Sequence, residues 1–181
     1  MDAIELLKHD HRRVEQLFRD YHAAASDTQR RGVVEILVHE LSAHAALEEL
    51  LVYPLAREEI PGGGQLADRH LAEHADVKKT LLALDRLGAG DERADALMAQ
   101  LEREIEEHVR EEEDEFLPRL RDAVGPRVID ELGHALKEAR RTAPTRPHPH
   151  APDQPPALAL AGPVAAVYDR VRDRLQGRPR P

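Results

Sequence analysis

The stretches HAALEELLVYP (44–54) and HVREEEDEFLP (108–118) repeat one pattern of polar residues. Each begins with a histidine, has Glu-Glu at the fourth and fifth positions after it, and has a proline at the tenth. A histidine and a glutamate four residues apart lie on the same face of an α-helix, about one turn apart. The repeat therefore predicts two helices that each present an imidazole and a carboxylate to the same interior.

The sequence around both stretches has the periodicity of amphipathic helices. Apolar residues recur at intervals of three and four, which predicts helices over residues 2–25, 28–54, 66–87 and 91–118. Asp2 is suited to cap the first of them. Long helices joined by connections of a few residues are antiparallel neighbours. We therefore expect an all-α fold, an antiparallel up-down-up-down four-helix bundle.

The chain continues beyond these four helices. Gly125-Pro126 opens a further amphipathic pattern, an additional fifth helix that we expect to pack across the bundle, so that residues 1–141 form one domain. Residues 142–163 are rich in proline and predict a disordered or extended linker. Residues 164–176 predict a short amphipathic C-terminal helix with arginines opposite its apolar face. It could dock on the acidic bundle, or bind a protein partner or an anionic membrane.

The composition excludes several classes of protein. The chain has 26 Lys/Arg against 35 Asp/Glu, and the acidic excess lies in residues 1–141, which argues against nucleic acid as a partner. Cysteine is absent, so neither a disulfide nor a thiolate metal site can form. No apolar run approaches the roughly 20 residues of a membrane span, and the N-terminus does not resemble a signal peptide. We expect a soluble, cytoplasmic protein.

Seven polar residues occupy positions in the helical stripes where leucine or valine would be expected. Burying one unpaired polar group costs about 1–3 kcal/mol, and an ionised carboxylate costs more. The sum would exceed the roughly 5–15 kcal/mol stability of a domain, so something must compensate these groups together. A purely structural helical protein is therefore disfavoured. The residues are His11, His44, Glu48, His70, His74, His108 and Glu112.

The heights of four histidines along the bundle predict that they meet. With a rise of about 1.5 Å per residue, His11 lies roughly 21 Å and His44 roughly 24 Å from the end of the bundle where the first helix ends. His74 lies roughly 20 Å and His108 roughly 25 Å from the same end. We therefore expect one layer of imidazoles in the core.

These residues form a ligand set for a pair of metal ions. Imidazole nitrogen with carboxylate oxygen suits iron, manganese or zinc. Five histidines and two glutamates are too many for one four-coordinate zinc and suit two six-coordinate ions. Glu48 and Glu112 come from facing helices, so each carboxylate could bridge both ions while histidines fill the outer positions. An open position would remain for a small ligand such as dioxygen or peroxide.

One known family has these histidines and acids in the same order, in the segments LLKHDHRRVEQLF (6–18), HAALEELLVYP (44–54), HLAEHADVKKTLLAL (70–84) and HVREEEDEFLP (108–118). The chain resembles the bacterial hemerythrin-like proteins, whose HHE cation-binding domain is a four-helix bundle around a non-haem di-iron centre. The resemblance implies two iron ions (Fe2+/Fe3+) joined by an oxo or hydroxo bridge. The ligands that it implies are His11, His44, Glu48, His74 and His108.

Three further positions stay open. His70 matches the extra histidine of oxygen-carrying hemerythrins, whereas many bacterial relatives use only the second histidine of that pair. The last acid is Glu113 by the spacing of the oxygen carriers and Glu112 by that of other HHE proteins. We favour Glu112, because Glu113 leaves the helical face by about a further 100°. Tyr53 could turn inward as a phenolate ligand or a radical-quenching neighbour.

The resemblance also limits the classes of function that we expect. It implies an iron centre that binds dioxygen or reacts with peroxide or nitric oxide, as an oxidoreductase that removes such molecules. The alternative is a module without turnover, which stores dioxygen or senses iron or oxygen and signals through a partner. The sequence leaves this choice, the physiological ligand and the oligomeric state open.

Overall fold

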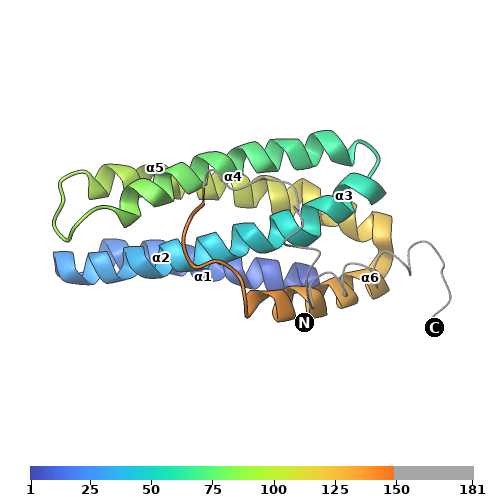
Figure 1. The fold of residues 1–181 in the computed structure, drawn as a ribbon, viewed down its shortest axis with the longest axis horizontal. Coiled ribbons are helices and arrows are strands. Elements are labelled where there is room, and N and C mark those ends of the chain that lie inside the picture. The colour runs from blue at the N-terminus through green and yellow to red at the C-terminus, as the bar shows by residue number, and fades with distance from the viewer. Residues whose placement is uncertain (149–181) are drawn as a thin grey trace.

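A computed structural model describes residues 1–148, and the regular secondary structure of this part of the chain is helical throughout (Figure 1). Four long helices run alternately in opposite directions, as the sequence predicted: α1 (Ala3–Ala23), α2 (Asp27–Leu47), α4 (Gly63–Asp85) and α5 (Ala94–Glu111). Among residues 1–148 no helix is both long and apolar enough to cross a membrane. The helix predicted at 164–176, and the linker after residue 148, lie outside the described residues.

The first two helices begin at side chains that accept backbone N–H groups. The carboxylate of Asp2 accepts the N–H of Glu5 at 2.8 Å, and the carboxylate of Glu5 accepts the N–H of Asp2 at 3.1 Å. The hydroxyl of Ser26 accepts the N–H of Gln29 at 3.3 Å. These donors have no partner within the first turn of a helix, so each cap stabilises the start of its helix. Asp2 thus caps α1 as the sequence predicted.

The sequence predicted that the two helices with the repeated motif stop at their prolines, but both helices widen and continue. The π-helical turns η1 (Glu48–Val52) and η2 (Glu112–Phe116) follow α2 and α5 and lead into α3 (Tyr53–Glu59) and α6 (Leu117–Arg140). Pro54 and Pro118 lack an N–H, and a proline ring clashes with the carbonyl four residues back in a continuous α-helix. The N–H just before each proline bonds five residues back instead, to the carbonyl of Glu48 or of Glu112. We attribute the repeated π turn to the repeated proline.

A break at Gly125 divides α6 into two parts. Gly125 has φ 78° and ψ 167°, a conformation that is essentially restricted to glycine. The part after the break turns back along α1 (Figure 1) and buries an apolar face that includes Leu132. At Gly133 a Cβ atom would lie 2.8 Å from backbone atoms of Asp2 and Ala3. Glycine therefore permits the close approach of α6 to the start of α1.

The core consists of two apolar clusters with a polar layer between them. On α1, Leu7 belongs to one cluster and Val14 to the other, and His11 lies between them in the sequence. A histidine likewise lies between residues of the two clusters along α2 and α4, and along α5 together with η2. The polar layer is therefore closed off by apolar side chains above and below.

Candidate metal centre

Four histidines, one from each long helix, meet in the polar layer. His11 lies on α1, His44 on α2, His74 on α4 and His108 on α5, and each has only 3–6% of its surface exposed. They form two pairs, with ring centroids 5.0 Å apart for His11 and His44 and 4.8 Å apart for His74 and His108. The structure thus brings together the histidines that the sequence placed at one depth.

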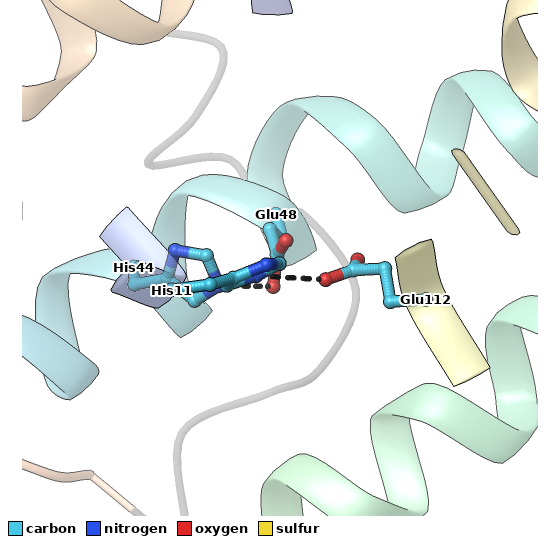
Figure 2. Close-up of side chains that lie close together, drawn as sticks. All are labelled: His11, His44, Glu48 and Glu112. Carbon is cyan, nitrogen blue, oxygen red and sulfur yellow. Dashed lines mark ion pairs between the residues drawn. The ribbon is translucent and has the colours of Figure 1, made fainter. Parts of the chain in front are cut away.

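Glu48 and Glu112 lie between the two histidine pairs, and neither is exposed to solvent. Figure 2 shows their carboxylates pointing toward one another from opposite sides of the layer. The Oε2–Nε2 distances are 3.2 Å for Glu48–His44, 3.3 Å for Glu48–His74, 3.2 Å for Glu112–His11 and 3.8 Å for Glu112–His108. Each carboxylate therefore contacts one histidine of each pair, as a carboxylate that bridges two cations would.

Many of these buried atoms have no hydrogen-bond partner among residues 1–148. They include Nε2 of His11 and of His44, Oε1 of Glu48 and both carboxylate oxygens of Glu112. Such atoms are rare in proteins, because each costs about 1–3 kcal/mol. Here they converge in one group, His11, His44, Glu48 and Glu112, whose ligand atoms all lie within 4.8 Å of one another, and Glu48 also belongs to a second such group with His74 and His108. Converging imidazole and carboxylate lone pairs fit metal cations.

The buried glutamates and the histidines beside them shift one another's pKa values. Burial raises the pKa of Glu48, but the positive charges of His44 and His74 beside it outweigh burial and hold that pKa well below its usual range. Burial lowers the pKa of His74, but Glu48 and Glu49 outweigh it and raise the pKa to about 9. These shifts favour a protonated His74 beside an ionised Glu48, whereas burial lowers the pKa of His108, and a bound cation could take over the charge balance from the proton.

The second ring nitrogen of each of the four histidines faces a carboxylate of another helix. The distances from Nδ1 are 3.5 Å for His44–Asp10, 3.0 Å for His74–Glu49, 2.7 Å for His108–Glu73 and 2.8 Å for His11–Glu113. The pairs follow one another around the bundle. The acid on α1 faces the histidine of α2, and the acid on η1 faces that of α4. The acid on α4 faces the histidine of α5, and the acid on η2 faces that of α1. A carboxylate in this position fixes the orientation and tautomer of a histidine ring. Three of the four contacts are hydrogen bonds, and the fourth, between Asp10 and His44, is an ion-pair contact. We call these four acids the outer carboxylates.

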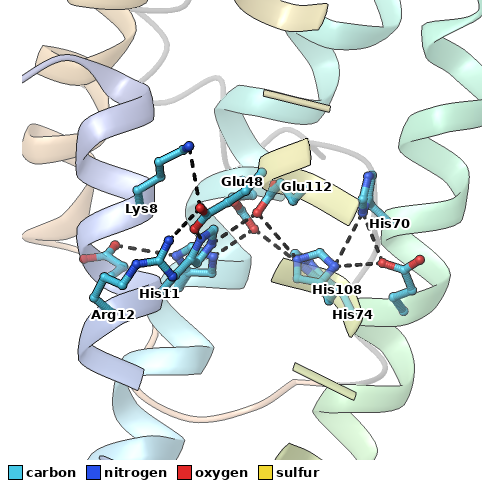
Figure 3. A network of polar contacts seen from close by, with 12 residues as sticks. Lys8, His11, Arg12, Glu48, His70, His74, His108 and Glu112 are labelled. Carbon is cyan, nitrogen blue, oxygen red and sulfur yellow. Dashed lines mark hydrogen bonds and ion pairs between the residues drawn. The ribbon is translucent and has the colours of Figure 1, made fainter. Parts of the chain in front are cut away.

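Each outer carboxylate has a further partner that can bear positive charge. The pairs are Glu113 with Arg12 (2.6 Å) and Lys8 (3.6 Å), Glu49 with Lys78 (2.7 Å), Asp10 with Arg140, and Glu73 with His70 (3.1 Å). Figure 3 shows Lys8 and Arg12 at one end of this network and His70 at the other. The hydrogen bond with His11 outweighs burial and lowers the pKa of Glu113 to about 2, so this outer carboxylate is ionised. Glu112 thus lies inside the centre and Glu113 outside it.

His70 is fully buried and is grouped with Glu73 and His108 rather than with the two central glutamates. Its Nδ1 lies 3.1 Å from Glu73 and 3.4 Å from Nδ1 of His108. Its ring stacks on that of Tyr53, at an interplanar angle of 18°. Its Nε2 has no hydrogen-bond partner in the described part of the chain. The structure thus places His70 beside the second histidine pair.

Tyr53 points into the centre. Its hydroxyl lies 3.3 Å from Oε2 of Glu48 and 3.0 Å from Nε2 of His74. Five residues after Glu48, it would point roughly 140° away in a continuous α-helix. The π turn contains one extra residue, which rotates the next residues back by roughly 100° and brings Tyr53 onto the face of Glu48. Pro54 is therefore the sequence signal for the π turn that directs the side chain of Tyr53 inward.

Asp10 and Glu73 belong to the site although the sequence did not single them out. Each immediately precedes a histidine of the centre, in Asp10-His11 and Glu73-His74, and this adjacency is the available signal. Neighbouring residues in a helix point about 100° apart, so each acid faces the next helix rather than the histidine beside it.

The fold and this cluster define a four-helix-bundle protein with His/Glu groups that could hold metal. The family model described as the hemerythrin HHE cation binding domain matches residues 2–120, about two-thirds of the chain. The chain therefore belongs to the hemerythrin HHE cation-binding family, as the sequence predicted.

Two known proteins resemble the chain over nearly its whole length. An uncharacterised hemerythrin-like protein of Schizosaccharomyces pombe is 27% identical over 172 residues, which cover 94% of this chain and 84% of that protein. The crystal structure of a hemerythrin HHE cation binding domain-containing protein from Mycobacterium kansasii matches with a TM-score of 0.67 and 22% identity. This match covers 94% of the chain and 99% of the crystallised one, and it shows that the two share a fold.

Proposed function

We propose that this chain binds two iron ions in the polar layer, one at each histidine pair, with Glu48 and Glu112 as the bridging carboxylates. One observation carries the proposal: each glutamate contacts one histidine of each pair while neither is exposed to solvent. The donor set of neutral imidazoles and carboxylates suits iron, and membership of a cation-binding family supports a metal as its occupant.

Iron in this position would supply a change of oxidation state and an open position for dioxygen, peroxide or nitric oxide. The residues of the chain set the conditions for that chemistry. The two apolar clusters keep bulk water away from the layer. The outer carboxylates hold the imidazoles in one orientation. The hydroxyl of Tyr53 offers a hydrogen bond beside Glu48, and burial together with the charges of Glu48 and Glu112 raises its pKa well above its usual value, so that the group keeps its proton until a stronger base forms beside it.

We infer that the centre reacts with its small ligand and does not only store or sense it. Reductive removal of peroxide or nitric oxide would consume protons together with electrons, which ferrous ions and an external reductant would supply. Tyr53 supports this inference, because its hydroxyl lies within hydrogen-bond reach of both Glu48 and His74. Reversible storage of dioxygen, or sensing through a partner, needs no such donor and is the alternative that experiment must separate.

Metal content tests the proposed bridging roles. Replacing Glu48 and Glu112 together by alanine should abolish stoichiometric iron binding, measured by elemental analysis of protein reconstituted with ferrous iron. The matched control is Glu35→Ala with Glu107→Ala, two exposed glutamates on α2 and α5, the helices that lead into η1 and η2, and it should leave the iron content unchanged. Two irons per chain in the Glu48/Glu112 variant would contradict the bridging roles.

Optical spectra separate reaction from storage. The iron-loaded protein is reduced without oxygen and mixed separately with dioxygen, peroxide and nitric oxide while the visible bands are followed. Repeated turnover in the presence of excess ascorbate as the electron donor supports reaction, and a stable spectrum that reverses when dioxygen is removed supports storage. Tyr53→Phe should keep its iron and slow turnover by about 10²-fold, the usual contribution of a positioned proton donor. An unchanged rate in this variant would remove Tyr53 from the reaction.

A further inference from the structure

The second part of α6 lies beyond residues 2–120, which the family model matches, and yet one of its side chains contacts the site. The guanidinium of Arg140 donates to the carboxylate of Asp10 through Nη2. The same Asp10 oxygen lies 3.5 Å from Nδ1 of His44, whose Nε2 lies 3.2 Å from Glu48. A line of three contacts therefore connects the end of α6 with a central carboxylate.

The packing of α6 on α1 fixes where Arg140 lies. Gly133 approaches the backbone of Asp2 and Ala3, and Arg140 reaches Asp10. Seven residues separate Gly133 from Arg140, and seven separate Ala3 from Asp10, which corresponds to two turns on each helix. The two helices therefore run side by side in the same direction, and the tight contact at Gly133 sets the register that places Arg140 on Asp10.

Asp10 needs this partner because it is buried. Its side chain is only 6% exposed, and a buried carboxylate is costly unless a charge or hydrogen bonds compensate it. Within residues 1–148 the ion-pair contacts of Asp10 are with Arg140, His44 and, at 3.9 Å, the exposed His9. Arg140 is the one permanently charged group among these three.

Asp10 differs from the other outer carboxylates in the origin of its partner. Glu113, Glu49 and Glu73 are held by side chains from α1 and α4, inside the matched residues 2–120. Only the contact to Asp10, among these four, comes from the returning part of α6. That segment therefore does more than cover the apolar end of the bundle.

We propose that Arg140 is a positioning residue of the metal centre: it holds Asp10 against Nδ1 of His44 and so keeps Nε2 of His44 directed at the ion beside Glu48. This inference rests on the proposed metal centre, but it concerns the orientation of one ligand only. Loss of a carboxylate contact to a metal-bound histidine typically weakens metal affinity about 10–100-fold. A loss of that size is expected without Arg140.

The test uses the full chain and cobalt(II), whose visible bands report the geometry of its ligands. Arg140→Met should weaken cobalt binding about 10–100-fold and change the bands. Arg140→Lys, which keeps a positive charge, should recover part of the affinity. The matched control is Arg141→Met, one residue further, where the side chain is 77% exposed and pairs with Glu138. This control should bind cobalt as the unmodified protein does.

A second substitution shows whether Arg140 acts through Asp10. Asp10→Asn should weaken cobalt binding by itself, and adding Arg140→Met to it should cause no further loss, because the two residues form one line of contacts. If Arg140→Met does not fold, Arg140→Lys and Asp10→Asn decide: normal affinity and bands in both would reject the proposal.

Failure of this inference differs from failure of the proposed centre. An unmodified protein that binds neither iron nor cobalt would reject the centre. An unmodified protein that binds cobalt, together with an Arg140→Met variant of equal affinity and spectrum, would reject only the role of Arg140. An equal loss in Arg140→Met and Arg141→Met, or an additive loss with Asp10→Asn, would also reject it.

Discussion

Glu112 and Glu113 are neighbours in the sequence, yet their carboxylates meet opposite edges of the same imidazole. Oε2 of Glu112 lies 3.2 Å from Nε2 of His11, while Oε1 of Glu113 lies 2.8 Å from Nδ1. Glu112 is fully buried, and Glu113 also pairs with Arg12 near the surface. One residue of difference thus separates a central carboxylate from an outer one.

This relationship predicts different metal contents for two adjacent substitutions. Glu112→Ala should lower the iron content below two per chain, because it removes a central carboxylate. Glu113→Ala should retain two irons with an affinity about 10–100-fold weaker, because His11 loses only the group that orients it. Elemental analysis and competition with a chelator measure both quantities. The reverse pattern would show that Glu113 is the ligand, as expected if the acid follows His108 by five residues, the spacing of the oxygen carriers.

The two histidines of α4 should also differ. His74 contacts Glu48 and His108 through Nε2, whereas His70 is grouped with Glu73 beside His108. His74→Ala should therefore remove one iron per chain, and His70→Ala should leave two. The two positions lie one turn apart on the same helix, so each variant serves as the control for the other. Equal loss of iron in both would make His70 a ligand.

Tyr21 gives the bundle a pH dependence far from the centre. Its hydroxyl donates to Asp95 at 2.8 Å, and burial together with this hydrogen bond raises its pKa to about 12, from the usual 10.0. The raised pKa favours the protonated form in the folded state. The hydrogen bond therefore contributes its full stability below about pH 10, and this contribution is lost as the pH rises through about 12.

Ultraviolet titration measures this effect. Tyr21→Phe should remove a tyrosinate transition near pH 12 and cost about 1 kcal/mol of stability at neutral pH. Asp95→Asn should move the same transition toward pH 10. A titration in which all tyrosine absorbance changes by about pH 10 would contradict the burial and the hydrogen bond of Tyr21.

Two glycines predict opposite effects on stability. A Cβ atom at Gly32, inside α2, would have no atom within 4 Å beyond its own helix, so Gly32→Ala should stabilise by about 0.5–1 kcal/mol. A Cβ atom at Gly63 would lie 2.0 Å from the backbone oxygen of Ala56, so Gly63→Ala should destabilise by about 1–3 kcal/mol. Urea unfolding of the metal-free protein measures both. A tolerated alanine at Gly63 would show that α3 and α4 pack less tightly.

The sequence located the histidines better than it located the ends of the helices. Apolar spacing and a constant rise per residue placed His11, His44, His74 and His108 at one depth, because both are properties of a single helix. Pro54 was wrongly expected to end its helix. A proline interrupts the α-helical hydrogen bonds between residues four apart, but here a π turn with a bond between residues five apart lets the helix continue. Local sequence preference does not distinguish a helix that ends at a proline from one that continues through a π turn.

The helical bundle, its layer of histidines and the two repeated glutamates could be predicted from the sequence, because the spacing of residues along one helix fixes which of them share a face and a depth. The contacts of Asp10 with His44 and of Arg140 with Asp10 could not be predicted in this way and appear only in the folded bundle. Such contacts depend on how each helix is rotated about its axis and on which helix lies beside it. Packing across the whole bundle sets both, and residues 130 positions apart in the chain then become neighbours.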